Sequence, residues 1–317
     1  MISRRAFGQA LMAAVPLRWV TAAPRAATAP AWIGVTTAAF HDLPRVTGRA
    51  NVEDVIGALQ AIGATHAELS LHNVEPAPPS TEPVMGGTAA YPRRIIPSAE
   101  QMAATNAEAR AALRSWRLET PATRLEEVRE RFARAGIALH ACSVEFDDSF
   151  TDAEIEATFQ QVRALGLTTV SSPLTLTMAR RLAPVAERHH VVVAIHNQVR
   201  GSAADAIDSG RLADALSLSS SFALKLDVGR LTASNVDVVS VLKQHLSRTS
   251  SILLSDRLRN GGTSQPLGEG DTPLKDVLAA VASTSQVPLF VGYDYLGLRS
   301  ATDEVRSSLA YLRRLSS

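Results

Sequence analysis

Short apolar runs alternate with helical stripes of apolar residues from about residue 31 to the end of the chain. The clearest run is 191–195, Val-Val-Val-Ala-Ile, which predicts a strand buried on both faces. Three polar residues, His196, Asn197 and Gln198, follow it directly. A buried strand that ends in polar side chains is where a parallel α/β protein places its chemistry, so this stretch is the first candidate site.

Eight runs are expected to be strands, at residues 31–35, 66–71, 137–144, 168–171, 191–196, 222–227, 251–255 and 289–293. Helices are expected to follow them: one capped by Asn51, two that begin with the capping boxes Thr123/Glu126 and Thr151/Glu154, then 178–188, 211–216, 236–246 capped by Asn235, 274–281 and 304–315. This alternation over residues 30–317 predicts one α/β domain, a (β/α)8 TIM barrel. The alternative, a doubly wound sheet, favours a glycine-rich phosphate loop after the first strand, which residues 36–40 do not resemble.

The segment 73–121, between the second strand and its helix, is a long insertion. It contains Pro76, Pro78, Pro79 and Pro83, and then a stretch of helical pattern at residues 98–116. In a barrel this connection lies on the catalytic face, where it would form a lid or rim of the site. The alternative is an excursion without a role in the site.

Composition and charge limit the classes of protein to which this chain can belong. Of 317 residues, 46% are hydrophobic and 20% are charged, as in an ordinary globular chain. A net charge of +1 gives no support to nucleic-acid binding. Cys142 is the one cysteine, so no internal disulfide forms. After the N-terminus, no stretch approaches the ~18 apolar residues that a membrane span needs.

Residues 1–29 have the layout of a cleavable export leader. Ser3-Arg4-Arg5-Ala6-Phe7 is similar to a twin-arginine signal, and a weakly apolar stretch and small residues follow it. We therefore expect a periplasmic or otherwise exported protein whose barrel begins near residue 30. The alternative is a frayed basic N-terminus.

The expected strand ends carry candidate chemistry. Because the carboxyl ends of barrel strands meet at one rim, we expect these side chains to converge: Glu68, His72, Glu145, His196, Asn197, Gln198, Lys225, Asp227, Arg230, Asp256, Arg257 and Asp294. Lys225 and Asp227 share one strand face, and a buried lysine needs a partner, which Asp227 or Glu145 would supply. Glu68 is either part of the site or half of a salt bridge in the barrel wall.

Three short motifs carry a resemblance. Residues 194–198, Ala-Ile-His-Asn-Gln, resemble an Ile-His-Asn-His motif, and residues 226–230, Leu-Asp-Val-Gly-Arg, resemble Leu-Asp-Val-Gly-His. Residues 267–270, Leu-Gly-Glu-Gly, resemble the Gly-x-Gly stretch before the last barrel helix. In this order the motifs are similar to those of the xylose isomerase-like sugar phosphate isomerase/epimerase barrels, particularly the exported bacterial branch.

The resemblance implies a small carbohydrate-like substrate, no nucleotide cofactor, and a divalent metal (Mn, Mg or Zn) at the ends of strands five to eight. His196 and Asp227 stand at the first two ligand positions of the family. The third and fourth positions fall on Leu253 and Gly292, which cannot ligate a metal through their side chains. Asp294 or Glu145 would have to complete the site.

The sequence is compatible with three functions. The first is an isomerase, epimerase or lyase that moves a proton next to a carbonyl, with His196 or Glu145 as base and Asp227 as metal or hydroxyl ligand. Without a metal, Lys225 or Arg230 would polarise the carbonyl. The expected substrate-binding residues are His72, Asn197, Gln198, Arg230, Asp256 and Asp294. The second function is a Schiff-base lyase that uses Lys225. The third is a carbohydrate-binding relative that has lost its chemistry.

Overall fold

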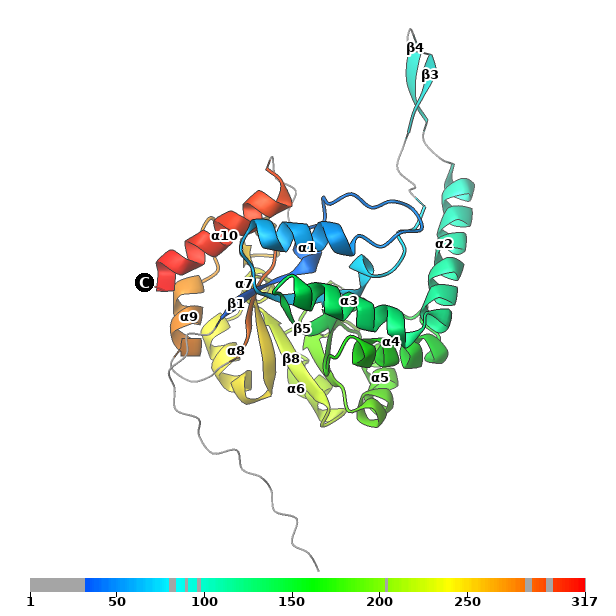
Figure 1. Ribbon diagram of the computed structural model, residues 1–317. Coiled ribbons are helices and arrows are strands. Elements are labelled where there is room, and N and C mark those ends of the chain that lie inside the picture. Colours follow the sequence, from blue (N-terminus) through cyan, green and yellow to red (C-terminus); the bar gives the residue numbers. More distant parts are fainter. Residues whose placement is uncertain are drawn as a thin grey trace, which may run out of the picture. The chain divides into compact units, whose positions relative to one another are not determined.

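The structure is a computed structural model that describes residues 32–79, 84–88, 91–95, 98–202, 205–282, 287–294 and 299–316. Eight parallel strands close into a barrel in the order β1-β12-β9-β8-β7-β6-β5-β2 (Figure 1). Their bounds are β1 (Ile33–Thr36), β2 (His66–Ser70), β5 (Ala138–Ser143), β6 (Thr169–Pro173), β7 (Val192–His196), β8 (Phe222–Asp227), β9 (Thr249–Leu254) and β12 (Leu289–Val291). The predicted (β/α)8 barrel is confirmed.

Helices surround the strands (Figure 1). They are α1 (Val52–Ala61), α3 (Ala122–Arg134), α4 (Asp152–Ala164), α5 (Leu176–His189), α6 (Leu212–Ser217), α7 (Val228–Ala233), α8 (Val238–His245), α9 (Leu274–Ala282) and α10 (Ala301–Ser316), with short 3-10 turns η1 (Thr37–Ala39), η2 (Leu71–Asn73) and η3 (Leu246–Arg248). Each long helix buries an apolar stripe, as α3 does with Leu125, Val128 and Phe132. Within the described residues, no helix has the length and hydropathy that a bilayer span requires. The predicted leader, residues 1–29, lies outside them.

Of the caps expected at Thr151, Thr123 and Asn51, the first forms, the second does not, and the third marks the right helix start without a side-chain cap. The capping box of Thr151 and Glu154 begins α4 as predicted. The box predicted at Thr123 does not form, because α3 already begins at Ala122 after Pro121. Asn51 precedes α1, but its side-chain oxygen accepts a hydrogen bond from Asn73 rather than capping the helix.

After β8 the chain forms two short helices in place of the single helix predicted over 236–246. The first, α7, starts directly at Val228, with the Asp227 side chain as its cap. Asn235 has a φ of +58° and lies in the bend between α7 and α8, and Asp237 caps α8 instead. Asp227 is therefore at once a strand end and a helix cap, and the turn of α7 brings Arg230 back over it.

The insertion contains an antiparallel hairpin, β3 (Val84–Thr88) and β4 (Tyr91–Ile95), and the long helix α2 (Ala99–Glu119). Ser98 and Gln101 form a capping box at the start of α2. Two ion pairs hold the last turns of α2 to α4. The carboxylate of Glu154 lies 3.1 Å from Arg114 Nε and 3.3 Å from Arg117 Nη1. A second hairpin, β10 (Asp256–Arg257) and β11 (Ser264–Gln265), follows β9.

Aromatic rings fill the amino-terminal end of the barrel interior. Trp32 stacks on His66 and lies against His140, at ring-centroid distances of 4.3 and 4.0 Å, and Phe290 packs edge-on against Trp32. Gly34 makes room for this packing, since a Cβ there would meet the Phe290 ring at 2.9 Å. The base of the barrel is thus closed, and any ligand has to enter from the carboxyl ends of the strands.

Candidate active site

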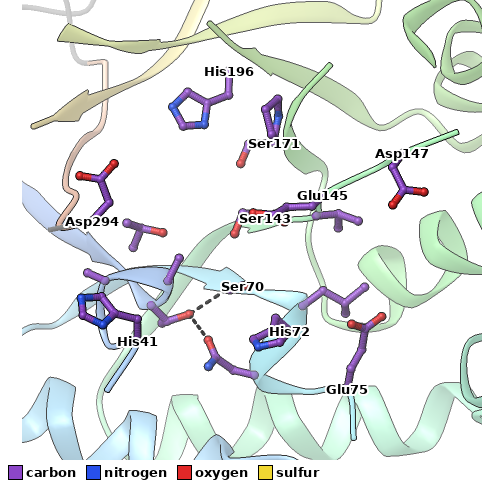
Figure 2. Close-up of a pocket in the computed structure, with 18 of the residues that line it drawn as sticks. His41, Ser70, His72, Glu75, Ser143, Glu145, Asp147, Ser171, His196 and Asp294 are labelled. Carbon is purple, nitrogen blue, oxygen red and sulfur yellow. Dashed lines mark hydrogen bonds between the residues drawn. The ribbon is translucent and has the colours of Figure 1, made fainter. Parts of the chain in front are cut away.

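A cavity of about 980 Å³ opens at the carboxyl ends of the barrel strands. All eight strands or the residues that follow them contribute to its lining: Thr36, Ser70, Ser143, Ser171, His196, Lys225, Asp227, Leu253 and Gly292. His196, Ser171, Glu145, Asp294, His72 and Glu75 are among the labelled side chains around this space in Figure 2. The predicted rim of converging polar groups is therefore a real cavity, large enough for a sugar-sized ligand.

Its floor is a buried ion pair that crosses the barrel. Lys225 Nζ lies 2.5 Å from Glu68 Oε2, and the two side chains are 3% and 0% exposed. Glu68 belongs to β2 and Lys225 to β8, strands on opposite sides of the closed order. Burial alone would raise the pKa of Glu68, but Lys225 and the hydroxyl of Ser171 outweigh it and lower that pKa. The partner of Lys225 is thus Glu68, and not Asp227 or Glu145 as the sequence suggested.

Asp227 stands beside this floor with both carboxylate oxygens occupied. Oδ1 accepts from the Ser255 hydroxyl at 2.5 Å and from the Arg230 backbone N–H at 3.0 Å. Oδ2 lies 3.1 Å from His196 Nε2 and 3.3 Å from Arg230 Nε. Burial would raise the pKa of this carboxyl, yet the His196 hydrogen bond and the Arg230 charge hold it well below its usual range.

His196 is a neutral imidazole in a fixed orientation. Burial, together with the charges of Arg230 and Lys225, lowers its pKa to about 4. Since the ionised Asp227 can only accept, His196 Nε2 carries the proton and donates it to that carboxylate. The second ring nitrogen, Nδ1, is then the unprotonated one and has the lone pair that a general base needs.

One face of α2 forms a wall of the cavity, through Asn106, Arg110, Leu113 and Arg117. Arg117 anchors this wall to the barrel. Its Nε lies 2.7 Å from Glu75 Oε1, and its guanidinium lies over the Phe150 ring at 4.2 Å. The insertion is therefore a rim of the cavity, one of the two predicted possibilities.

Each of the five Lys and Arg side chains that line the cavity has a partner. Lys225 pairs with Glu68, Arg230 with Asp227, Arg117 with Glu75, and Arg110 with Asp147, while Arg45 donates to the carbonyls of His72 and Glu75. The lining thus carries no excess of unpaired cations that would attract an anionic ligand.

Seven of the residues singled out in the sequence line the cavity: His72, Glu145, His196, Lys225, Asp227, Arg230 and Asp294. Glu145 is exposed on it, whereas Asp294 lies 3.4 Å from Arg257 and accepts from Ser264. Asp294 is thus engaged with the β10–β11 hairpin.

Three others hold the backbone and are not among the lining residues. Asn197 exchanges two hydrogen bonds with the main chain of Asp227, at 2.7 and 3.2 Å. Gln198 donates to the carbonyl of Leu174, and Asp256 accepts from the backbone N–H groups of residues 268, 270 and 272. The substrate-binding role predicted for Asn197, Gln198 and Asp256 does not fit these contacts, because their polar atoms already serve the barrel rim.

Three residues of the site were not predicted from the sequence: Ser255, Glu75 and Arg117. Ser255 had a detectable signal, since it follows β9 as Asp227 ends β8. Glu75 and Arg117 had none, because they meet only when the insertion folds back over the barrel.

No family model matches the chain, and no curated protein matches it in sequence. Solved structures do match it in fold. A xylose isomerase domain protein from Planctomyces limnophilus aligns with a TM-score of 0.57 at 12% identity, over 90% of this chain and 96% of that one. The chain shares the (β/α)8 barrel fold of this structure.

Two further solved structures align over 89% of this chain and 98% of their own. The 3-keto-D-glucoside 4-epimerase of E. coli gives a TM-score of 0.57 at 12% identity. The D-psicose 3-epimerase of Clostridium cellulolyticum H10 gives 0.58 at 10% identity. Identities this low establish the architecture, while the chemistry has to be argued from the residues of this chain.

The sequence resemblance to the xylose isomerase-like barrels implies a divalent metal, but the residues of this cavity do not fit one. A catalytic metal needs about three side-chain ligands with free lone pairs. Among the described residues, which include His196, Asp227, Glu145 and Asp294, no three His, Cys, Asp or Glu side chains come together as a possible metal site. Asp227 also accepts three hydrogen bonds and forms an ion pair with the Arg230 guanidinium. The geometry therefore argues against the metal site predicted from the resemblance.

Proposed function

We propose that this protein is an exported enzyme that binds a carbohydrate and moves a proton on a carbon next to a carbonyl group. One observation carries the proposal: a neutral His196, oriented by Asp227, lines a sugar-sized cavity beside the cationic groups of Lys225 and Arg230. A base close to fixed positive charge is the arrangement that enolisation needs, because the carbonyl oxygen becomes negative as the carbon loses its proton.

His196 Nδ1 accepts the proton in this proposal. Asp227 keeps Nε2 protonated and stabilises the imidazolium that forms. Glu145, which lines the same cavity and is exposed, supplies the second acid/base group that an isomerase or epimerase requires to return a proton. The balanced charge of the lining favours an uncharged sugar over a sugar phosphate.

Lys225 has a different role from the one a Schiff-base lyase would give it. Its ammonium is held by Glu68 in the floor, and a lysine must lose its proton before it can attack a carbonyl. Borohydride treatment in the presence of a keto-sugar is expected to leave Lys225 unmodified, as judged by peptide mass spectrometry.

Proton exchange tests the main proposal without knowledge of the product. The purified protein is incubated with a panel of neutral ketoses and aldoses in D₂O, and deuterium incorporation beside the carbonyl is followed by NMR. We expect exchange with at least one sugar, and a loss of about 10²–10⁴-fold in His196→Gln. His245→Gln, a histidine outside the cavity lining, is the matched control. Exchange that persists unchanged in His196→Gln would overturn the assignment of the base.

The second candidate function is carbohydrate binding without turnover. It is favoured by the contacts of Asp227, because its three hydrogen bonds and its ion pair with Arg230 compete with a reacting hydroxyl for this carboxylate. Calorimetric binding of a sugar that shows no deuterium exchange would select this alternative.

A further inference from the structure

The positive charge next to Asp227 is a side chain of the protein, that of Arg230. Arg230 approaches Asp227 twice, through its backbone N–H at 3.0 Å and its Nε at 3.3 Å. We infer that the Arg230 guanidinium is the resident cation of this cavity, in the place that a divalent metal would take on Asp227, and that the site works without a metal. This inference concerns the same site as the proposed function, but its first test requires no sugar.

The contacts of Asp227 are built into the local fold. Its carboxylate accepts three hydrogen bonds, from the Ser255 hydroxyl, His196 Nε2 and the Arg230 backbone N–H, and the Arg230 guanidinium is its ion-pair partner. Gly229 permits this arrangement, because a Cβ at this position would collide with the Ser255 hydroxyl. A metal could reach Asp227 only by breaking these contacts, one of which is a charge-assisted ion pair at a buried carboxylate.

The neighbouring strands supply no replacement ligand. Leu253 is the direct partner of Asp227 in the β8–β9 register, so the position beside the carboxylate is apolar. The Leu253 side chain lies over Gly292, where a Cβ would meet its Cδ1 at 2.9 Å. Leu253 and Gly292 therefore interlock, and an apolar side chain fills the space in which an additional ligand from β9 or β12 would stand.

Arg230 has donors to spare for a ligand. A guanidinium carries five N–H groups, the Nε of Arg230 lies 3.3 Å from Asp227 Oδ2, and 26% of this cavity-lining side chain is exposed. A partly exposed cation held in this position can bind a carbonyl oxygen and stabilise the negative charge that develops on it. Arg230 would then be a catalytic residue that touches the substrate, while Asp227 positions both Arg230 and His196.

Metal titration is the first experiment. The full chain is treated with a chelator, dialysed, and titrated calorimetrically with Mn²⁺, Co²⁺ or Zn²⁺ alone, beside an Asp227→Asn variant. We expect no saturable binding to the cavity. The double variant Arg230→Ala/Leu253→His frees Asp227 and places an imidazole beside it, and we expect it to gain one equivalent of Co²⁺ with a visible absorption band. One equivalent of metal on the unaltered chain that Asp227→Asn removes would overturn the inference.

The role of Arg230 toward the ligand is tested with the sugars of the exchange assay. We expect the exchange rate to be unchanged by chelator, about 100-fold lower in Arg230→Gln, and partly retained in Arg230→Lys, which keeps the charge. A rate that falls with chelator and returns with added metal would contradict the inference. If no sugar exchanges at all, the proposed function fails, while the metal titration still decides whether Arg230 replaces a metal.

Discussion

At the scale of single residues, a buried ammonium persists only where a carboxylate meets it, and Lys225 meets Glu68 in the floor of the cavity. We expect Lys225→Met to lower the free energy of unfolding by about 3–5 kcal/mol, because it leaves Glu68 charged and unpaired. The double variant Glu68→Leu/Lys225→Met should recover most of this loss. Urea denaturation of Lys225→Met, Glu68→Leu and the double variant completes the cycle, and additive losses would contradict the pairing.

The histidines at the base of the barrel predict acid sensitivity. Burial lowers the pKa values of His66 and His140, and His66 adds charge repulsion for His140. Unfolded histidines take up protons near pH 6.5, so the unfolded chain binds more protons than the folded one below that pH. Stability is therefore complete above about pH 6.5 and falls as the pH drops toward the folded pKa values.

His140→Phe should flatten this pH dependence while keeping the stack on Trp32. It also removes His140 Nε2, a buried atom with no hydrogen-bond partner among the described residues. Removal of this atom should raise the free energy of unfolding by about 1 kcal/mol at pH 7. Thermal melts from pH 4 to 8 test both effects. An unchanged slope would show that these rings do not govern acid unfolding.

Strand-end residues could be predicted because parallel strands bring their carboxyl ends to one rim. Their partners could not. Lys225 was expected to meet Asp227 or Glu145, since spacing along one strand is visible in sequence. The separation between β2 and β8 across a closed barrel is set by strand order and register, which no local pattern encodes.

At the scale of elements, Glu154 joins two helices. It completes the capping box of α4 with Thr151 and receives Arg114 and Arg117 from α2. We expect Thr151→Ala to cost about 1 kcal/mol in unfolding free energy and to leave α2 in place. Glu154→Gln should instead release α2, with faster amide exchange along residues 106–117 and weaker ligand binding. Equal exchange in both variants would argue against the anchor.

Element types were predictable from apolar periodicity, whereas two helix starts were not. Thr123 and Asn235 have the right chemistry for caps, but Pro121 and Asp237 begin the helices. Directly after β8, the contact between Asp227 and Arg230 starts a helix at Val228. Tertiary contacts, rather than local propensity, therefore fix where this helix begins.

At the scale of the whole molecule, the barrel closes without the N-terminal segment, since β1 begins at Ile33 and pairs with β2 and β12. We expect a chain that starts at residue 30 to melt at the same temperature as the full chain. In cells, Arg4→Lys/Arg5→Lys should keep the protein in the cytoplasm, as fractionation would show. A lower melting temperature for the shortened chain would mean that residues 1–29 belong to the fold rather than to a leader.

The pair of Glu68 and Lys225 also bears on how the chain folds. The two residues are 157 positions apart, so neither meets its partner until both β2 and β8 are in place. While the barrel is open, water solvates both groups, and the cost of burying either one alone arises only as the interior closes. Pairings of such long sequence range are those that slow folding.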